Sequence, residues 1–289
     1  MRYYSYFPGC SAEATASPLG LSVPPVAKEL DMDLIELEDW NCCGSSPYGS
    51  VDKLEATCMA ARNLALAEKR GFDLVTPCSS CYITLNGADI RLKEYPNFRD
   101  QVNQALAAGN LDYHGGVRVR HLAEVLYSDV TPEVIGAKVS RSLKGLKVAS
   151  YYGCQLVRPA VGFDDPESPR SLDELVASLG ADVVSWQLKA HCCGGSLVMS
   201  EQDLALELIN KLLRNAQENG AQCLVTPCPL CQINLDAYQS QVNSKFKTNY
   251  NLPVLFLTQL IGVALDIKPN ALGLQRNIVS PMKVLAPYL

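Results

Sequence analysis

The stretch WNCCGSSPYGS (40–50) sets two cysteines side by side between an asparagine and a glycine, and AHCCGGSLVM (190–199) has a second such pair, between a histidine and a glycine, 150 residues later. Neighbouring thiols make a poor disulfide with each other, because the eight-membered ring that they close is strained. A pair that occurs twice in one chain therefore indicates a chemical role for both thiols.

Ten of the twelve cysteines form two matching sets, with the spacings C-x31-CC-x34-C-x2-C and C-x37-CC-x34-C-x2-C. The sets are Cys10, Cys42, Cys43, Cys78 and Cys81, and Cys154, Cys192, Cys193, Cys228 and Cys231. The match extends beyond cysteine, since YYSYFPGC (3–10) resembles VASYYGC (148–154) and the segment 61–81 resembles 209–231. The sequence therefore predicts a duplicated structural unit.

Each unit alternates predicted strands with predicted helices, which is typical of an α/β fold with mainly parallel sheets flanked by helices. We expect strands at 3–7, 33–38, 72–77, 146–152, 181–186 and 223–227. A segment with Pro, two Gly and polar residues at 131–145 precedes the second unit. The chain is thus expected to consist of a first cysteine-rich repeat at 1–140 and a second one at 141–289.

Helix signals are clearest in the segment 52–71, where Asp52 is a predicted N-cap and Gly71 a predicted stop. A second helix is expected to open at Ser171 with Glu174 and to close at Gly180. In a third, at 201–219, an apolar stripe is expected at Leu204, Leu208 and Leu212.

The predicted strands end where the cysteines begin. Cys10 and Cys154 lie just past strand ends, each TPC motif places a cysteine at the carboxyl end of a strand, and both CC loops follow predicted strands. Open α/β sheets form their sites at this edge. We therefore expect the five thiols of a unit to meet at one end of one sheet.

Thiolate clusters of this kind point to metal chemistry. A tetrahedral zinc takes four ligands, so five cysteines are one too many, and adjacent cysteines chelate a single ion poorly. A multinuclear iron–sulfur site offers several irons to neighbouring thiolates, which favours it. Zinc in at least one unit and a thiol–disulfide role for the CC pairs remain open.

Composition bounds the partners and the compartment. A net charge of −5, a pI near 5.3 and the lack of a Lys/Arg run argue against a nucleic-acid surface. No basic and apolar leader is visible at the N-terminus, so a cytoplasmic location is expected. The apolar segment 252–267 is shorter than the roughly 20 residues of a membrane span, and we expect a buried strand and a packed helix there, with an interfacial membrane contact as the alternative.

The double cysteine pattern resembles the CCG-domain family that includes the B subunit of heterodisulfide reductase. The likeness also covers YFPGC (6–10), ARNLALAE (61–68), VRHLAEVLY (119–127), YYGCQLVRP (151–159), CCGG (192–195) and RNIVSP (276–281). The resemblance implies two noncubane [4Fe-4S] clusters, one on each set of five cysteines. It also implies an oxidoreductase that cleaves a disulfide with two electrons, or forms one in reverse.

Partners follow from the same resemblance. The chain shows no G-x-G-x-x-G fingerprint for a flavin or nicotinamide site. The resemblance therefore implies a complex with a ferredoxin-like C subunit that carries cubane clusters and a flavin-containing A subunit. An alternative within the same family is an electron-relay or membrane-docking subunit of a succinate or fumarate oxidoreductase.

Residues outside the two sets receive plainer interpretations. Cys58 and Cys223 are expected in the core. His191 could donate a hydrogen bond near the second CC pair, whereas His114 and His121 have no partner visible in the sequence. The glycines after each pair, Gly44, Gly194 and Gly195, are expected to let the backbone approach the cluster, and Pro77 and Pro227 to fix the turn before C-x2-C.

Overall fold

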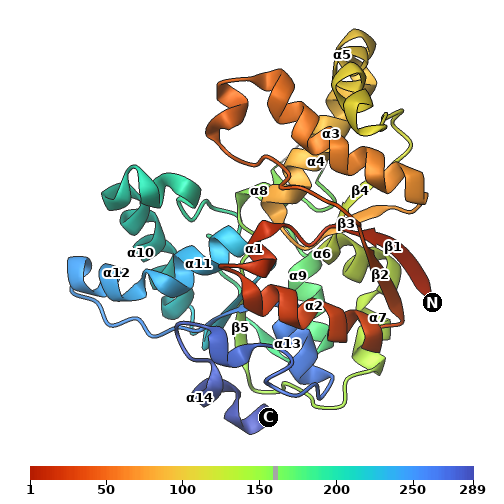
Figure 1. The fold of residues 1–289 in the computed structure, drawn as a ribbon. Coiled ribbons are helices and arrows are strands. Elements are labelled where there is room, and N and C mark those ends of the chain that lie inside the picture. Colours follow the sequence, from red (N-terminus) through yellow and green to blue (C-terminus); the bar gives the residue numbers. More distant parts are fainter. Residues whose placement is uncertain (159–161) are drawn as a thin grey trace.

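The computed structural model describes residues 1–158 and 162–289 and contains two four-stranded sheets flanked by helices (Figure 1). The strands are β1 (Arg2–Tyr6), β2 (Met32–Glu36), β3 (Leu74–Thr76), β4 (Val119–His121), β5 (Lys147–Ser150), β6 (Asp182–Val183), β7 (Cys223–Thr226) and β8 (Val254–Phe256). The strand orders β2-β1-β3-β4 and β6-β5-β7-β8 are the same, and every pairing is parallel. The α/β fold with two repeated halves is thus confirmed.

Helices connect the strands in both halves. The first half contains α1 (Cys10–Glu13), α2 (Ser17–Glu29), η1 (Pro47–Ser50), α3 (Lys53–Arg70), α4 (Ser79–Glu94), α5 (Pro96–Leu106), η2 (Ala107–Gly109), α6 (Leu122–Val125), the π-helical η3 (Leu126–Val130) and α7 (Pro132–Ala137). The second contains α8 (Cys154–Val157), α9 (Ser171–Ser178), η4 (Gly195–Met199), α10 (Gln202–Glu218), α11 (Pro229–Ala237), α12 (Gln239–Phe246), α13 (Leu257–Ala264), η5 (Leu274–Arg276), α14 (Met282–Leu285) and η6 (Ala286–Tyr288).

Helix α3 forms as its end signals predict. The carboxylate of Asp52 accepts the backbone N–H of Glu55 at 2.9 Å, and Gly71 closes the helix at φ 77°. An Asp side chain accepts a hydrogen bond from an N–H group that is unpaired at the start of a helix. A Gly adopts the left-handed backbone conformation that ends the helix.

The other two predicted helices form, with differences in detail. Helix α9 begins at Ser171 as predicted, and the carboxylate of Asp164 accepts the N–H groups of Arg170 and Ser171, at 3.0 and 2.8 Å. In α10 the predicted stripe is only partly right, because Leu212 is buried and Leu208 half-buried but Leu204 is 48% exposed. The full buried face carries Ala205, Leu206, Ile209, Asn210, Leu212, Leu213 and Ala216.

The halves pack on each other through helices that follow equivalent strands. Helix α2 of the first half packs against α13 of the second, where Ser22 and Thr258 share a buried hydrogen bond of 2.6 Å. Helix α9 of the second half packs in the same way against η3 and α7 of the first. One buried apolar cluster accordingly draws residues from both halves. The boundary between 1–140 and 141–289 stays a prediction.

The apolar segment 252–267 forms β8 and α13, as predicted. Every residue of β8 and of α13 is buried. The apolar side chains of these two elements therefore pack inside the protein and offer no lipid-facing surface. None of the helices among the described residues is both long and apolar enough to span a bilayer.

Candidate functional site

The carboxyl end of each sheet gathers the cysteines. Strand β1 lies between β2 and β3 in the first sheet. The connection after β1 therefore runs to one side of the sheet and the connection after β2 returns to the other, which makes the boundary between β1 and β3 a topological switch point. Such a switch point opens a crevice at the carboxyl edge of the sheet. The segments that follow β1, β2 and β3 carry Cys10 at the start of α1, the pair Cys42–Cys43 in a loop, and Cys78 with Cys81 at the start of α4. The segments after β5, β6 and β7 carry the second set in the same way.

The first set forms a chain of neighbouring sulfurs. Cys10 Sγ lies 4.0 Å from Cys42 Sγ, and Cys43 Sγ lies 3.4 Å from Cys81 Sγ. Cys78 completes the chain through a hydrogen bond to Cys81. The structure thus brings together all five thiols, although up to 71 residues separate them in the sequence.

The second set repeats this chain. Cys154 is hydrogen-bonded to Cys192, Cys193 Sγ lies 3.6 Å from Cys231 Sγ, and Cys228 is hydrogen-bonded to Cys231. In neither set do the thiols surround one point. Within residues 1–158 and 162–289, no group of three or more Cys, His, Asp or Glu side chains is arranged to hold a metal ion.

Burial divides each set into an outer and an inner part. Cys10, Cys42 and Cys192 are exposed and Cys154 is half-buried. The inner thiols are buried, and they are Cys43, Cys78, Cys81, Cys193, Cys228 and Cys231. A molecule that approaches either site from solvent therefore meets the first cysteine and the first member of the CC pair.

Hydrogen bonds among the thiols favour thiolates at selected positions. The bond with Cys81 lowers the pKa of Cys43 to about 7, and the bond with Cys154 lowers the pKa of Cys192. The partners show the opposite shift, since the pKa of Cys81 is raised by its bond with Cys43 and that of Cys154 by its bond with Cys192. Each half therefore holds at least one thiol that ionises readily. The thiolate is also the form of cysteine that binds metals.

A glycine directly before the first cysteine lets the inner sulfur approach. A Cβ on Gly9 would lie 2.9 Å from Cys81 Sγ, and a Cβ on Gly153 would lie 2.9 Å from Cys231 Sγ. Both residues also have positive φ, at 76° and 68°. The approach of the backbone to a cluster at Gly44, Gly194 and Gly195 stays a prediction; these glycines face Met59 of α3, Ala205 of α10 and Leu230 of α11. The repeated Gly-Cys at 9–10 and 153–154 is the sequence signal for the close approach of the inner sulfur.

An asparagine from α3 holds the CC loop of the first half. The buried Asn63 accepts the backbone N–H of Asn41 and donates to the carbonyl of Asn41, both at 3.0 Å. Arg62 adds an ion pair with Asp39 and a hydrogen bond to the Asn41 side chain. Asp39 is 81% exposed at its side chain, so this half fixes its loop partly from the surface.

The CC loop of the second half is held by a different helix. Asn234 of α11 donates to the carbonyls of Cys193 and Gly195, at 3.3 and 2.9 Å. Ahead of the pair, the carbonyl of Lys189 accepts the N–H groups of Tyr152 and Gly153. This links the CC loop directly to the turn that carries Cys154.

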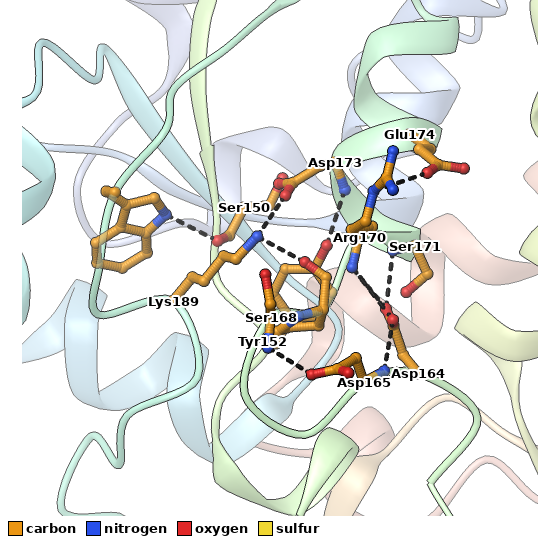
Figure 2. Close-up of polar contacts among 12 residues, drawn as sticks. Ser150, Tyr152, Asp164, Asp165, Ser168, Arg170, Ser171, Asp173, Glu174 and Lys189 are labelled. Carbon is orange, nitrogen blue, oxygen red and sulfur yellow. Dashed lines mark hydrogen bonds and ion pairs between the residues drawn. The ribbon is translucent and has the colours of Figure 1, made fainter.

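Figure 2 shows how Lys189 is itself anchored. Its ammonium group donates to the carboxylate of Asp173 at 2.8 Å and to the carbonyl of Pro169 at 2.6 Å. The N–H of Asp173 in turn donates to the Tyr152 hydroxyl. The second half thus replaces an exposed ion pair by a partly buried one.

The remaining residues singled out from the sequence fall into several environments. The side chain of His191 is exposed, and its carbonyl accepts the Tyr151 hydroxyl at 2.7 Å. His114 pairs with Asp112 on the surface, and His121 is fully buried. Cys223 lies in the core as predicted, whereas Cys58 is only half-buried. Pro159, the last residue of the quoted segment 151–159, lies outside the described residues.

Known proteins share both the cysteine pattern and the fold. The profile of the cysteine-rich CCG domain matches residues 4–86 and 148–236. The chain is 38% identical over 97% of its length to the 8-methylmenaquinol:fumarate reductase membrane anchor subunit of Wolinella succinogenes, of which it covers 98%. It is 33% identical over 99% of its length to the B subunit of the ferredoxin/F420H2-dependent CoB-CoM heterodisulfide reductase of Methanosarcina acetivorans, of which it covers 97%.

A protein of Archaeoglobus profundus that is described as similar to the heterodisulfide reductase B subunit is 34% identical, with 92% of each chain covered. A crystal structure of a hypothetical protein from Helicobacter pylori superposes with a TM-score of 0.80 at 17% identity, over 96% of this chain. The chain spans 52% of that longer protein, and the likeness shows the fold alone.

Proposed function

This chain belongs to the family of cysteine-rich CCG-domain proteins, and from that premise we propose that it is the iron–sulfur subunit of a heterodisulfide reductase-like complex. In this function it cleaves a disulfide reductively, or forms one in the reverse direction. The supporting observation is the pair of five-thiol chains, each complete and each with an exposed outer end.

The ten cysteines fit two multinuclear clusters. Cys10, Cys42, Cys43, Cys78 and Cys81 would hold one noncubane [4Fe-4S] cluster, and Cys154, Cys192, Cys193, Cys228 and Cys231 the other. A row of sulfurs, with two of them on adjacent residues, suits several irons better than one tetrahedral ion. Zinc in one half is the alternative metal content. When bound, such clusters supply electrons one at a time.

Two one-electron sites match the demand of the reaction. Cleavage of one S–S bond consumes two electrons and two protons and gives two thiols. The outer cysteines, of which Cys10, Cys42 and Cys192 are exposed, leave each site open to a substrate. The duplication thereby acquires a chemical reason. The partners that would supply the electrons are a ferredoxin-like C subunit and a flavin-containing A subunit, and the location would be the cytoplasm.

Metal analysis of anaerobically purified protein tests this function. We expect about eight iron and eight acid-labile sulfide per chain for two four-iron clusters. We also expect an electron paramagnetic resonance signal that changes when oxidant and a thiol are added. Near-stoichiometric zinc with little sulfide would contradict the proposal.

The likeness to the fumarate reductase anchor subunit supports a second candidate. In that function the same two clusters would relay electrons between quinol and partner subunits, and no disulfide would be cleaved. Assays of the native complex separate the two. Thiol release from a disulfide supports the first, whereas quinol-dependent reduction by a complex that sediments with membranes supports the second.

A further inference from the structure

Two adjoining cavities lie beside the CC loop of the first half. The smaller has a volume of about 310 Å³ and is lined by residues 44–46, which directly follow the CC pair, and by residues of α3 and α4. The larger, of about 690 Å³, continues between α3, α4 and α5, which pack on each other (Figure 1). Lys53, Gly87 and Arg91 line both cavities, so the two together form one groove.

The groove contains two cations and almost no negative charge. Arg91 of α4 is half-buried and donates to the Thr57 hydroxyl at 3.5 Å, and Lys53 is the first residue of α3. Within the described part of the chain, neither cation forms an ion pair with a carboxylate. No described residue that lines the smaller cavity is acidic, and the larger cavity has only the exposed Glu94. The protein therefore does not neutralise the positive charge of the groove.

The carboxylates closest in sequence to Lys53 have other partners. Asp52 accepts the backbone N–H of Glu55, and the carboxylate of Glu55 accepts the Tyr48 hydroxyl. A cation at the first position of a helix lies at the positive end of the helix dipole, which disfavours it. An anion bound next to Lys53 would remove this repulsion.

The second half has no charge at the equivalent place. Its helix α10 begins at Gln202 as α3 begins at Lys53, and Gln241 follows the C-x2-C motif at the same distance as Arg91 does. The side chain of Gln202 donates to that of Gln241 at 3.3 Å. The fold is thus built with a neutral pair at this place, and the two cations of the first half are not needed to form it.

A glycine inside α4 leaves the groove open. Gly87 lines both cavities, and a Cβ at this position would meet no described atom within 4 Å apart from the backbone around it. Glycine is also a poor residue for a helix interior. Its lack of a side chain therefore provides space in the groove and no helix stability.

The two ends of the groove differ in polarity. Ile90, Tyr95 and Phe98 line the larger cavity, beyond the two cations. Small-molecule sites of ~300–1,000 Å³ commonly combine such apolar surface with a few polar groups that orient the ligand. A guanidinium group is well suited to bind the oxygens of a carboxylate or a phosphate.

We propose that this groove binds a small organic oxyanion, with its carboxylate or phosphate group held by Lys53 and Arg91 and its apolar part along Tyr95 and Phe98. The ligand would lie beside the loop that carries the first CC pair, because residues 44–46 line the groove. The inference goes beyond the proposed function and does not require clusters, so metal analysis and ligand binding test different claims.

Isothermal titration calorimetry of the full chain in its native complex tests the proposal, with phenyl phosphate and inorganic phosphate as probes. We expect phenyl phosphate to bind more tightly than inorganic phosphate, because only phenyl phosphate has an apolar part. Arg91→Gln installs the residue of the second half and should weaken the binding of phenyl phosphate by about tenfold or more, as should Lys53→Gln.

Two further variants separate a lost site from a general effect. Lys211→Gln removes an exposed cation of α10 that lines neither cavity, and it should leave binding unchanged. Gly87→Leu fills the groove and should abolish binding. Its thermal unfolding midpoint should not fall, because leucine favours a helix more than glycine does. If Gly87→Leu does not fold, Arg91→Gln and Lys53→Gln decide.

Disulfide turnover by the native complex distinguishes two sources of the oxyanion, and this measurement alone rests on the proposed function. Competitive inhibition by phenyl phosphate would identify the ligand as an anionic arm of the substrate. Binding without competition would identify it as a separate molecule. Both outcomes support the site.

Three results would overturn the inference. The first is no binding of phenyl phosphate to the wild type at millimolar concentration. The second is unchanged binding in Arg91→Gln, or equal weakening in Arg91→Gln and Lys211→Gln, which would reflect net charge alone. The third is binding to the free full chain but not to the complex, which would assign the groove to an acidic segment of a partner subunit.

Discussion

The two halves place five thiols in the same way but support them differently. Asn63 of α3 fixes the first CC loop, while the second is fixed by Asn234 of α11, which corresponds to α4 and not to α3. Ahead of the CC pair, the first half has an ion pair between the exposed Asp39 and Arg62. At the equivalent place the second half has an ion pair between Lys189 and Asp173. The sulfur positions are evidently what the fold must conserve between its halves, whereas the side chains that hold the loops are interchangeable.

The sheets differ in the same manner at their last strands. Arg120 of β4 is 5% exposed at its side chain and forms ion pairs with Glu124 and Asp129, at 2.9 and 2.6 Å. Its counterpart in β8 is Leu255, which is fully buried among apolar residues. At this position the first half thus has a buried ion-pair network, and the second half has apolar packing.

The largest effect should come from removing one ligand in either half. Cys42→Ser and Cys192→Ser are each expected to lose about half of the iron and sulfide, because each set holds its own cluster. Metal analysis of the anaerobically purified variants measures this, with Cys58→Ser as a control outside both sets. Loss of all iron in either variant would mean that the halves do not hold separate sites.

A second comparison concerns Arg120 and Leu255. Arg120→Ala leaves the buried carboxylate of Glu124 and the half-buried one of Asp129 without their shared cation, and should lower the free energy of unfolding by ~3–5 kcal/mol. Leu255→Ala leaves a cavity at the equivalent place and should cost ~2–5 kcal/mol. Urea unfolding measures both, and Arg118→Ala, at an exposed partner of Glu124, should cost no more than ~1 kcal/mol. A small effect of Arg120→Ala would show that the charged network does not stabilise the first half.

The two asparagines offer a smaller and more local test. Asn63→Leu introduces the residue found at the equivalent position 213 and should destabilise the first half by ~1–3 kcal/mol, because the Asn41 backbone groups lose their partners. Adding Thr84→Asn transfers the brace of the second half, since position 84 corresponds to Asn234 and lines a cavity with Gly44 and Ser45. The double variant should recover part of the loss in urea unfolding and in the rate of iron release to a chelator. No recovery would show that the two braces are not interchangeable.

The smallest expected effect is a pH dependence found in the first half alone. The pKa of His121 is lowered to about 3 by burial, whereas the unfolded chain takes up this proton near pH 6.5. Between these values only the unfolded state is protonated, so stability falls as the pH is lowered, by up to ~1.4 kcal/mol per unit. His121→Phe should flatten this slope in urea midpoints between pH 7 and pH 5. An identical slope in the variant would assign the acid sensitivity to other groups.

Local signals predicted much of the fold, and contacts between distant elements account for the rest. Asp52 and Gly71 bound α3 because caps act within one turn of the chain. The predicted stripe of α10 is right at Leu212 and wrong at Leu204, because other elements build the core that this helix faces, bury Leu206 and leave Leu204 exposed. Spacing identifies all ten cysteines, and the structure brings each set together.

The supporting residues of the site were not visible in the same way. Asn63 lies on α3 and Asn234 on α11, and their relation to the two CC loops appears only in the folded chain. Gly9 and Gly153 were within reach of sequence reasoning, because the repeat itself aligns them.

The matched contacts of α2 with α13 and of α9 with α7 give the fused chain the geometry of a symmetric pair. Two identical copies of one half would carry every substitution twice, so an asparagine gained on one side would also appear on the other. A single continuous chain removes that restriction. Covalent fusion therefore allows mutation to act on one site at a time, and Asn63 on one side against Asn234 on the other is such a departure from symmetry.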